Sequence, residues 1–253
     1  MRTFIIYTVL LLASVVVKAA DATSLEHWEA GNRAYATGDY NKAIEEYKTI
    51  VDGGEYSLEL YYNLANAYFK ADSLGKAILY YNKALRLDQS QPDVIHNLAF
   101  AEARTKDKVA EIPEFFLSVW ARAVRNSMSC TTWSVLSLLS IALLLVFALV
   151  FLLASRIGVR KVGFFGALCT FVVLVITTSF AISSRNDMLQ HDEAIIMASA
   201  ISVKSSPDGS ATDLFLLHEG TKVRIVAEVD SWCEVTLIDG KKGWIERKNI
   251  EEI

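Results

Sequence analysis

The sequence predicts a multidomain membrane protein with an all-α repeat domain, a two-helix transmembrane hairpin and a C-terminal all-β barrel. Three observations support this: a self-similarity at a fixed offset, two uncharged apolar runs, and a series of short alternating strands. The 253 residues are 53% hydrophobic with a mean hydropathy of +0.30, whereas soluble domains are about 45–50% apolar. The excess lies in residues 4–17, 133–154 and 162–182, which indicates membrane segments rather than one large core.

Charge and reactive residues exclude several classes of function. The net charge is −4 and the pI about 5.6, and no basic stripe indicates nucleic-acid binding. Cys130, Cys169 and Cys233 are widely spaced and fit no metal-ligand pattern. The sequence has no glycine-rich phosphate loop and no nucleophile–base arrangement. We therefore expect no nucleic-acid partner, no metal, no cofactor and no enzymatic activity.

The first apolar block predicts a signal peptide over residues 1–20. Met1 and Arg2 precede the apolar stretch 4–17, and small residues follow it. A basic start, a short apolar stretch and a small-residue exit are typical of secretory signals. The stretch is shorter than the ~20 residues that a spanning helix needs. The signal would export the domain that follows, and an uncleaved N-terminal anchor stays open as the alternative.

The other two blocks predict transmembrane helices at 133–154 and 162–183. Both are uncharged, and a helix of this length extends about 33 Å, close to the thickness of the hydrocarbon core. The loop between them, 155–161, has three cations among seven residues, and short loops rich in Arg and Lys stay in the cytoplasm. A hairpin with a cytoplasmic tip places both flanking domains on the opposite side, in agreement with the signal peptide.

Residues 109–132 join the first domain to the first span and mix aromatic residues with cations. Phe116, Trp120 and Ala123 fall near one face at helical spacing. We expect an interfacial helical segment that lies at the membrane surface and leads into Trp133 as an anchor. The alternative is a helix that caps the preceding domain.

Residues 24–108 predict the repeat domain, because similar residues recur 34 positions apart. The matching pairs are Asn32 and Asn66, Ala43 and Ala77, Tyr47 and Tyr81, Asn63 and Asn97, Leu64 and Leu98, and Ala67 and Ala101. Together with helical periodicity, this pattern resembles the tetratricopeptide repeat, whose period is about 34 residues. We count two full repeats, 24–57 and 58–91, and one further helix at about 92–105 that covers the open end.

This resemblance implies a groove that binds peptides or protein segments. In and beside the first helix of each repeat, the candidate residues are Trp28, Asn32, Tyr35, Tyr62, Asn63, Asn66, Phe69 and His96. Asparagine amides can hydrogen-bond an extended backbone, and aromatic rings supply contact area. The Lys and Arg residues with which some relatives clamp a C-terminal carboxylate are missing, so carboxylate capture is not expected. Packing of the aromatic residues between helices is the alternative.

Residues 194–253, after a linker at 184–193, predict a small barrel. Short strands are expected at 194–198, 201–204, 213–217, 222–228, 232–237 and 243–246. The segment Leu217–Val223, the tryptophan at 232 and the ending Gly243-Trp244-Ile245 resemble a bacterial SH3-like domain. Some members of that family bind cell-wall peptides and others bind proteins. Trp232 and Trp244 are candidates for an aromatic binding face, and a place in the barrel core is the alternative for both.

The order of segments resembles the BatE family, which is encoded with the aerotolerance (Bat) proteins of Bacteroidota-type bacteria. The resemblance covers essentially the whole chain and is closest at Val203–Val223. It implies a protein of the bacterial inner membrane with both soluble domains in the periplasm, linked to stress or oxygen tolerance. The expected function is that of an interaction scaffold. Its expected partners are membrane or periplasmic proteins, including other Bat proteins, and its hairpin would contact the lipid bilayer. The alternative is a cell-wall sensor or anchor that binds peptidoglycan through its SH3-like domain.

Overall fold

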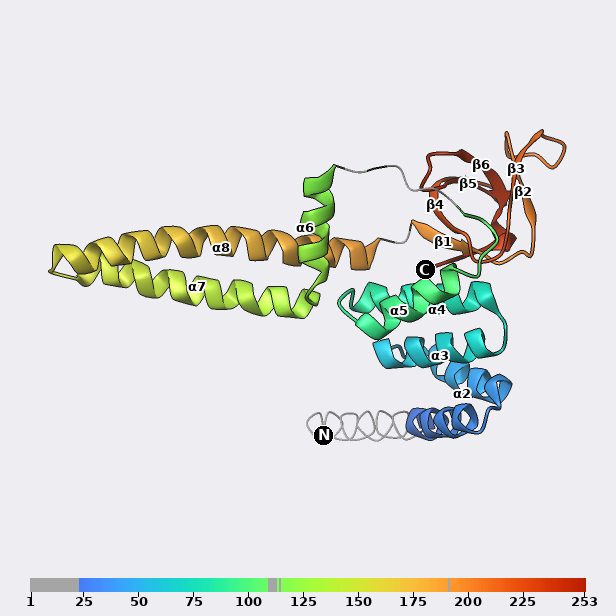
Figure 1. The fold of residues 1–253 in the computed structure, drawn as a ribbon, viewed down its shortest axis with the longest axis horizontal. Helices are drawn as coiled ribbons and strands as arrows, with labels where there is room; N and C mark the ends of the chain where they lie inside the picture. Colours follow the sequence, from blue (N-terminus) through green and yellow to red (C-terminus); the bar gives the residue numbers. More distant parts are fainter. Residues whose placement is uncertain (1–22, 109–112, 114, 191) are drawn as a thin grey trace, which may run out of the picture. The chain divides into compact units, whose positions relative to one another are not determined.

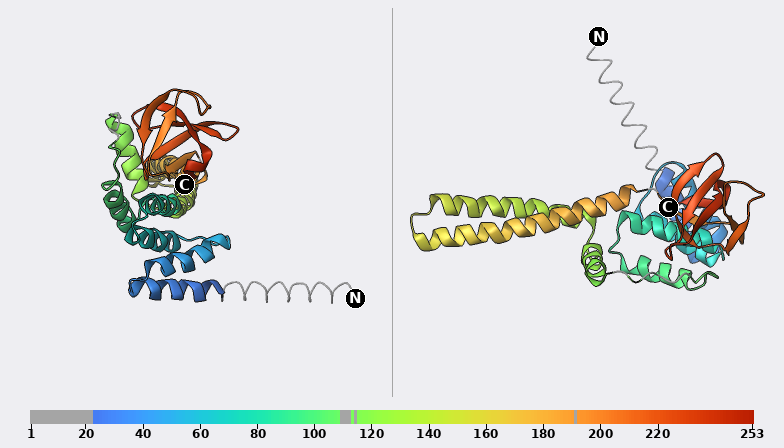
Figure 2. Two further views of the ribbon diagram at one scale, coloured as in Figure 1. Left: turned by 90° about the vertical axis from the view of Figure 1, so that its right-hand side faces the viewer. Right: turned by 90° about the horizontal axis from the view of Figure 1, so that it is seen from above.

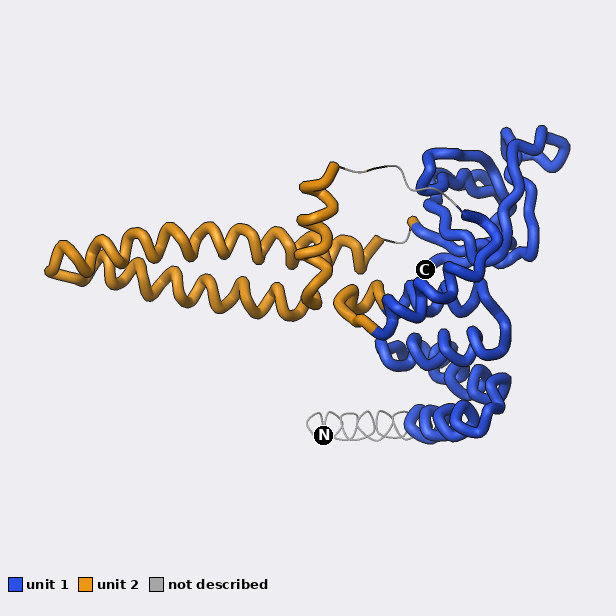
Figure 3. The backbone as a smooth tube through the Cα atoms, viewed as in Figure 1, with its two compact units in different colours: residues 1–84, 93–109, 193–253 blue, residues 85–92, 110–192 orange. Residues whose placement is uncertain are grey.

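The computed structural model describes residues 23–108, 113, 115–190 and 192–253 (Figure 1). The predicted signal peptide at 1–20 lies outside the described residues. The chain divides into two compact units (Figure 3). The first holds residues 1–84, 93–109 and 193–253, and the second holds residues 85–92 and 110–192.

The N-terminal region is helical, as predicted. A helix over residues 23–36 is followed by α2 (Tyr40–Asp52), α3 (Leu58–Lys70), α4 (Leu74–Leu87) and α5 (Pro92–Glu102). Local sequence explains where these helices begin. The side chain of Asp39 accepts a hydrogen bond from the backbone N–H of Lys42, and that of Ser57 accepts one from Leu60, so each satisfies a helix N-terminus that would otherwise lack a partner.

Small residues allow the repeat helices to pack closely around two buried tyrosines. Tyr47 and Tyr81 are each 1% exposed, and Ala65, 34 positions after Gly31, is fully buried. A Cβ atom on Gly31 would lie 2.6 Å from the ring of Tyr47, well inside van der Waals contact. The glycine therefore provides the space into which the first tyrosine packs.

The second unit contains two long apolar helices, α7 (Cys130–Leu153) and α8 (Ile157–Leu189). Both are long and apolar enough to cross a membrane by length and composition. The helix α8 has 33 residues and extends beyond the predicted span at both ends. The non-helical residues between α7 and α8 are 154–156, and residues 184–189 of the predicted linker are helical. A helix satisfies its own backbone hydrogen bonds and need not end where the apolar run ends.

Residues at seven-residue spacing form the contact between α7 and α8. The buried residues of α8 are Gly163, Thr170, Thr177 and Ser184, and this spacing is typical of helices that wrap around each other with a left-handed supercoil. Across the contact, the hydroxyl groups of Ser137 and Thr178 lie 2.7 Å apart. Small and hydroxyl-bearing residues are characteristic of helix contacts in membranes.

The C-terminal region is an antiparallel sheet of β1 (Glu193–Ile196), β2 (Ile201–Lys204), β3 (Asp213–Leu217), β4 (Lys222–Val229), β5 (Trp232–Thr236), β6 (Lys242–Glu246) and β7 (Ile250–Glu252), with a 3-10 turn at Arg247–Asn249. The strand order is β3-β2-β6-β5-β4-β1-β7. The prediction of a closed barrel is therefore wrong, because β3 and β7 form the two edges of an open sheet. Alternating residues reveal which face of a strand is buried, but closure depends on pairing between distant strands.

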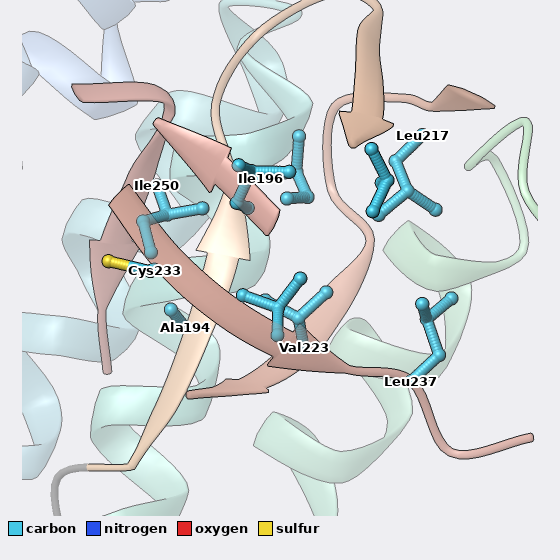
Figure 4. Close-up of a cluster of buried hydrophobic side chains, with 10 residues drawn as sticks. Ala194, Ile196, Leu217, Val223, Cys233, Leu237 and Ile250 are labelled. Carbon is cyan, nitrogen blue, oxygen red and sulfur yellow. The ribbon is translucent and has the colours of Figure 1, made fainter. Parts of the chain in front are cut away.

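One face of this sheet forms a compact core (Figure 4). Its buried members are Ala194, Ile196, Val203, Leu217, Val223, Cys233, Val235, Leu237, Ile245 and Ile250. Burial, with a smaller contribution from Glu228, raises the pKa of the Cys233 thiol to about 11. The thiol is therefore protonated near neutral pH, and Cys233 is an apolar packing residue.

Candidate functional site

A hydrogen-bond network links the first helix of one repeat to the first helix of the next. The amide oxygen of Asn32 accepts bonds from the Tyr47 hydroxyl at 2.7 Å and from Asn63 Nδ2 at 3.3 Å. The two bonds fix the orientation of the Asn32 amide. Because both bonds use its oxygen, the NH₂ group of Asn32 is the part of this amide that can donate to a ligand.

The same network recurs one repeat later. The amide oxygen of Asn66 accepts bonds from the Tyr81 hydroxyl at 2.6 Å and from Asn97 Nδ2 at 3.0 Å. Asn97 also donates to the hydroxyl of Tyr62 at 3.0 Å. The repeats therefore carry a two-step ladder of amides, each held by a buried tyrosine.

The other predicted groove residues lie in different environments. The rings of Trp28 and Tyr47 are 5.7 Å apart, and those of Phe69 and Phe100 are also 5.7 Å apart. Both Trp28 and Phe69 are half-buried, so part of each ring packs between helices. Tyr35 packs edge-on against Tyr40. His96 is exposed on α5 and is not among the residues that the amide network joins.

Three members of the ladder were not among the predicted site residues. These are Tyr47, Tyr81 and Asn97, which hold the amides of Asn32 and Asn66. The signal that identifies them was present in the sequence, because the repeat offset already pairs Tyr47 with Tyr81 and Asn63 with Asn97. What the offset alone does not reveal is which matched residues contact each other.

We expect Tyr81→Phe to destabilise the second repeat by about 1 kcal/mol, the net contribution of one hydrogen bond. The change removes the bond to Asn66 and keeps the buried ring. The Asn66 oxygen retains its bond from Asn97, which limits the loss. Thermal unfolding followed by helical circular dichroism should show a lower midpoint. Tyr56→Phe is the control because Tyr56 is 66% exposed, and an equal effect of both changes would contradict the role of the ladder.

Trp232 and Trp244 lie on the face of the sheet opposite its core. Cys233 pairs with Ile245 across β5 and β6, and both are buried in the core. Because side chains alternate along a strand, the two tryptophans project from the other face, where both are half-buried. Glu234 lies directly opposite Trp244. Placement in the barrel core is therefore wrong for both residues.

Asp107, in the segment after α5, joins the helical repeats to the sheet within the first unit. Its carboxylate accepts bonds from the backbone N–H of His218 at 2.6 Å and from the Thr221 hydroxyl at 2.7 Å, and it lies 2.7 Å from His218 Nδ1. Burial would raise the pKa of Asp107, but the bonds from Thr221 and His218 outweigh burial and lower it. The contact thus depends on the charged form of the carboxylate.

The turn between β3 and β4 forms the rest of this joint. The carboxylate of Glu219 accepts a bond from the backbone N–H of Gly75 at 2.7 Å, and Lys76 pairs with Glu251. A Cβ atom on Gly220 would lie 2.9 Å from the side chains of Ile78 and Thr105. We define the joint as Asp107 with Gly75 and Lys76 on the repeat side, and His218–Thr221 with Glu251 on the sheet side.

The joint has a consequence for topology. Residues 75–107 and 218–251 can make these contacts only when they lie in the same compartment. The hairpin, with its even number of helices, would also return the chain to the side from which it started.

Acid should open the joint. The lowered pKa of Asp107 contributes stability that is fully present above the ordinary value of 3.8 and is lost as the pH falls through the lowered value. Asp107→Asn should weaken the joint at neutral pH by about 2–3 kcal/mol, because charge-assisted bonds are lost. Hydrogen exchange of the Gly75 and His218 amides reports on opening. Asp208→Asn is the control, since the Asp208 carboxylate accepts bonds from Ser210 in its own turn. Unchanged exchange in Asp107→Asn would contradict the role of Asp107.

These features define a chain with two interaction modules, a helical repeat array and a small antiparallel sheet. Comparison with known protein families gives the same classes: residues 58–91 match the tetratricopeptide repeat, and residues 199–251 match the bacterial SH3 domain. A search of curated proteins finds no match. The first family suggests protein–protein interaction and the second suggests cell-wall binding, and both are typically non-catalytic. Within the described part of the chain, no group of three or more His, Cys, Asp or Glu residues is placed to hold a metal.

Proposed function

We propose that this protein is a non-enzymatic, membrane-anchored interaction scaffold of the bacterial cell envelope. The amide ladder of Asn32 and Asn66 is the observation that carries the proposal. Two amides one repeat apart, each with its oxygen held by a tyrosine and an asparagine, leave their NH₂ groups to donate to the backbone of an extended segment. Half-buried rings at Trp28, Tyr62 and Phe69 supply apolar contact on either side.

The membrane-bound arrangement belongs to the same proposal. The helices α7 and α8 span the inner membrane, and Arg156, Arg160 and Lys161 keep their tip in the cytoplasm. The repeats and the sheet then lie together in the periplasm, with the joint between them intact. A partner bound in the groove would be a periplasmic protein or the periplasmic part of a membrane protein.

The order of the segments supports a more specific assignment. This order resembles that of the BatE family. The resemblance supports the proposal that the protein acts together with other Bat proteins, in a complex linked to stress or oxygen tolerance. In that setting, the groove would bind a segment of another member of the complex. The two-helix anchor would keep the groove close to the membrane surface.

Recovery of partners from cross-linked membranes tests the groove. In a triple variant with Asn32→Ala, Tyr62→Ala and Asn63→Ala, we expect at least a tenfold loss of the partners that co-purify with the wild type, because each lost bond contributes about 1 kcal/mol or more. The control is Lys42→Ala with Glu45→Ala, two exposed changes on α2. Circular dichroism verifies that both variants fold. Unchanged recovery with the triple variant would overturn the groove proposal.

Peptidoglycan binding through the sheet is the second candidate. The match to the bacterial SH3 domain and the outward placement of Trp232 and Trp244 favour it, because the accessible part of a half-buried tryptophan ring can contact an apolar or peptide ligand. The full-length protein in detergent should then sediment with purified sacculi, and Trp232→Ala with Trp244→Ala should abolish the effect. Absence of co-sedimentation with the wild-type protein would exclude this candidate.

A further inference from the structure

The helix α6 (Phe116–Asn126) has one apolar face and one polar face. At 100° per residue, Phe116, Val119 and Trp120 fall on one side, and Ser118 and Arg125 fall on the other. The three apolar side chains are exposed, with 72%, 48% and 62% of their surfaces accessible. No residue of α6 is buried, so this helix does not contribute an apolar face to a protein core within the described unit.

Arg125 anchors α6 to the ends of the apolar helices. Its guanidinium lies 2.7 Å from the carboxylate of Asp187 and donates to the Ser183 hydroxyl at 2.6 Å. Its carbonyl accepts a bond from Trp133 Nε1 at 2.8 Å. The partners lie at the first turn of α7 and at the last turns of α8, where the uncharged runs end. The anchor therefore holds α6 at the level where the apolar surface of the hairpin begins.

The direction of α6 completes the geometry. It runs across α7 and α8 rather than along them, and two views agree on this (Figures 1 and 2). If the hairpin spans a membrane, a helix that crosses it at this level is parallel to the membrane plane.

We propose that α6 is a membrane-surface helix that buries Phe116, Val119 and Trp120 at the boundary between lipid headgroups and acyl chains. The inference rests on the proposed function only in requiring that the hairpin span the bilayer. Aromatic and apolar residues on one face with cations on the other are suited to this zone. The Arg125–Asp187 pair would fix the depth of the helix relative to the hairpin.

Spin labels on the full-length protein in lipid nanodiscs test this placement. Labels are introduced through Phe116→Cys, Trp120→Cys and, as the matched control on the polar face, Ser118→Cys. The background carries Cys130→Ala and Cys169→Ala, while Cys233 is kept because it is 1% exposed. Leu145→Cys, on the exposed surface of α7, reports on the hairpin itself. Collisions with oxygen, which concentrates in lipid, are compared with collisions with a water-soluble nickel chelate.

We expect a severalfold higher ratio of oxygen to nickel collisions at positions 116 and 120 than at position 118. Frequent nickel collisions at both 116 and 120, with mainly oxygen collisions at 145, would overturn the inference about α6. That result would still agree with a hairpin that spans the membrane. Shielding of 116 and 120 from both reagents would also overturn it, because that result would indicate a helix that caps a protein surface. A nickel signal at 145 would instead contradict the proposed membrane anchor.

Discussion

Gly220→Val is expected to separate the repeats from the sheet. Gly220 has φ of +87°, which a β-branched residue strongly disfavours. The added side chain would also meet Ile78 and Thr105 at 2.9 Å from its Cβ. Strain and overpacking together should cost about 2–5 kcal/mol. Hydrogen exchange of amides in α4 and in the turn between β3 and β4 should accelerate, whereas Gly209→Val, with open space around it, should change neither.

Gly75→Leu provides the complementary test from the repeat side. Gly75 lies in α4, where leucine favours the helix, so the change keeps the helix and acts on its contact with the sheet. Its Cβ would lie 2.8 Å from the Glu219 side chain and 3.3 Å from the carbonyl of Ile196. Backbone amides in the turn between β3 and β4 should lose their protection from hydrogen exchange, while amides in the core of the sheet should keep theirs. Wild-type protection at the turn in both variants would contradict the joint.

Gly163→Leu is expected to open the packing of α7 against α8. A Cβ atom at this position would lie 2.6 Å from the backbone nitrogen of Phe151 and 3.0 Å from the carbonyl of Phe147. Backbone atoms cannot rotate away as a side chain can, so the helices must separate locally. The cost should reach about 3 kcal/mol, the upper end of ordinary overpacking.

Cysteine cross-linking measures this separation. The ring centroids of Phe151 and Phe164 are 5.9 Å apart, so a short bifunctional thiol reagent should bridge Phe151→Cys and Phe164→Cys when position 163 is glycine. The yield should fall sharply with Gly163→Leu. Gly158→Leu, at the tip and with no neighbour within 4 Å, should leave the yield unchanged. Equal yields in all three backgrounds would show that Gly163 does not set the helix spacing.

Features set by local periodicity were predictable from the sequence. The fixed offset between matching residues predicts the repeats and pairs the residues that later form the amide ladder. Strands β2 and β3 begin and end where alternation predicted. Local patterns succeed because helix and strand periods are recorded in neighbouring residues.

Features that depend on distant contacts could not be predicted. Asp107 and His218 are 111 positions apart, and no sequence motif around either residue indicates that they contact each other. The Glu219-Gly220 turn resembled part of the bacterial SH3-like pattern, yet in this chain it contacts the repeats. The strand β7 has only three residues and escaped prediction because so short a strand shows no alternation. The open sheet likewise depends on non-local pairing.

Both interaction modules are proposed to share the non-cytoplasmic side of one membrane. Labelling of single cysteines with a membrane-impermeant maleimide in intact spheroplasts tests it most directly, with Glu45→Cys on the repeats, Ser210→Cys on the sheet and Gly158→Cys at the hairpin tip, all exposed positions. We expect labelling at positions 45 and 210 in intact spheroplasts, and at position 158 only after permeabilisation. Labelling at 158 in intact spheroplasts, or protection of either 45 or 210, would contradict this arrangement.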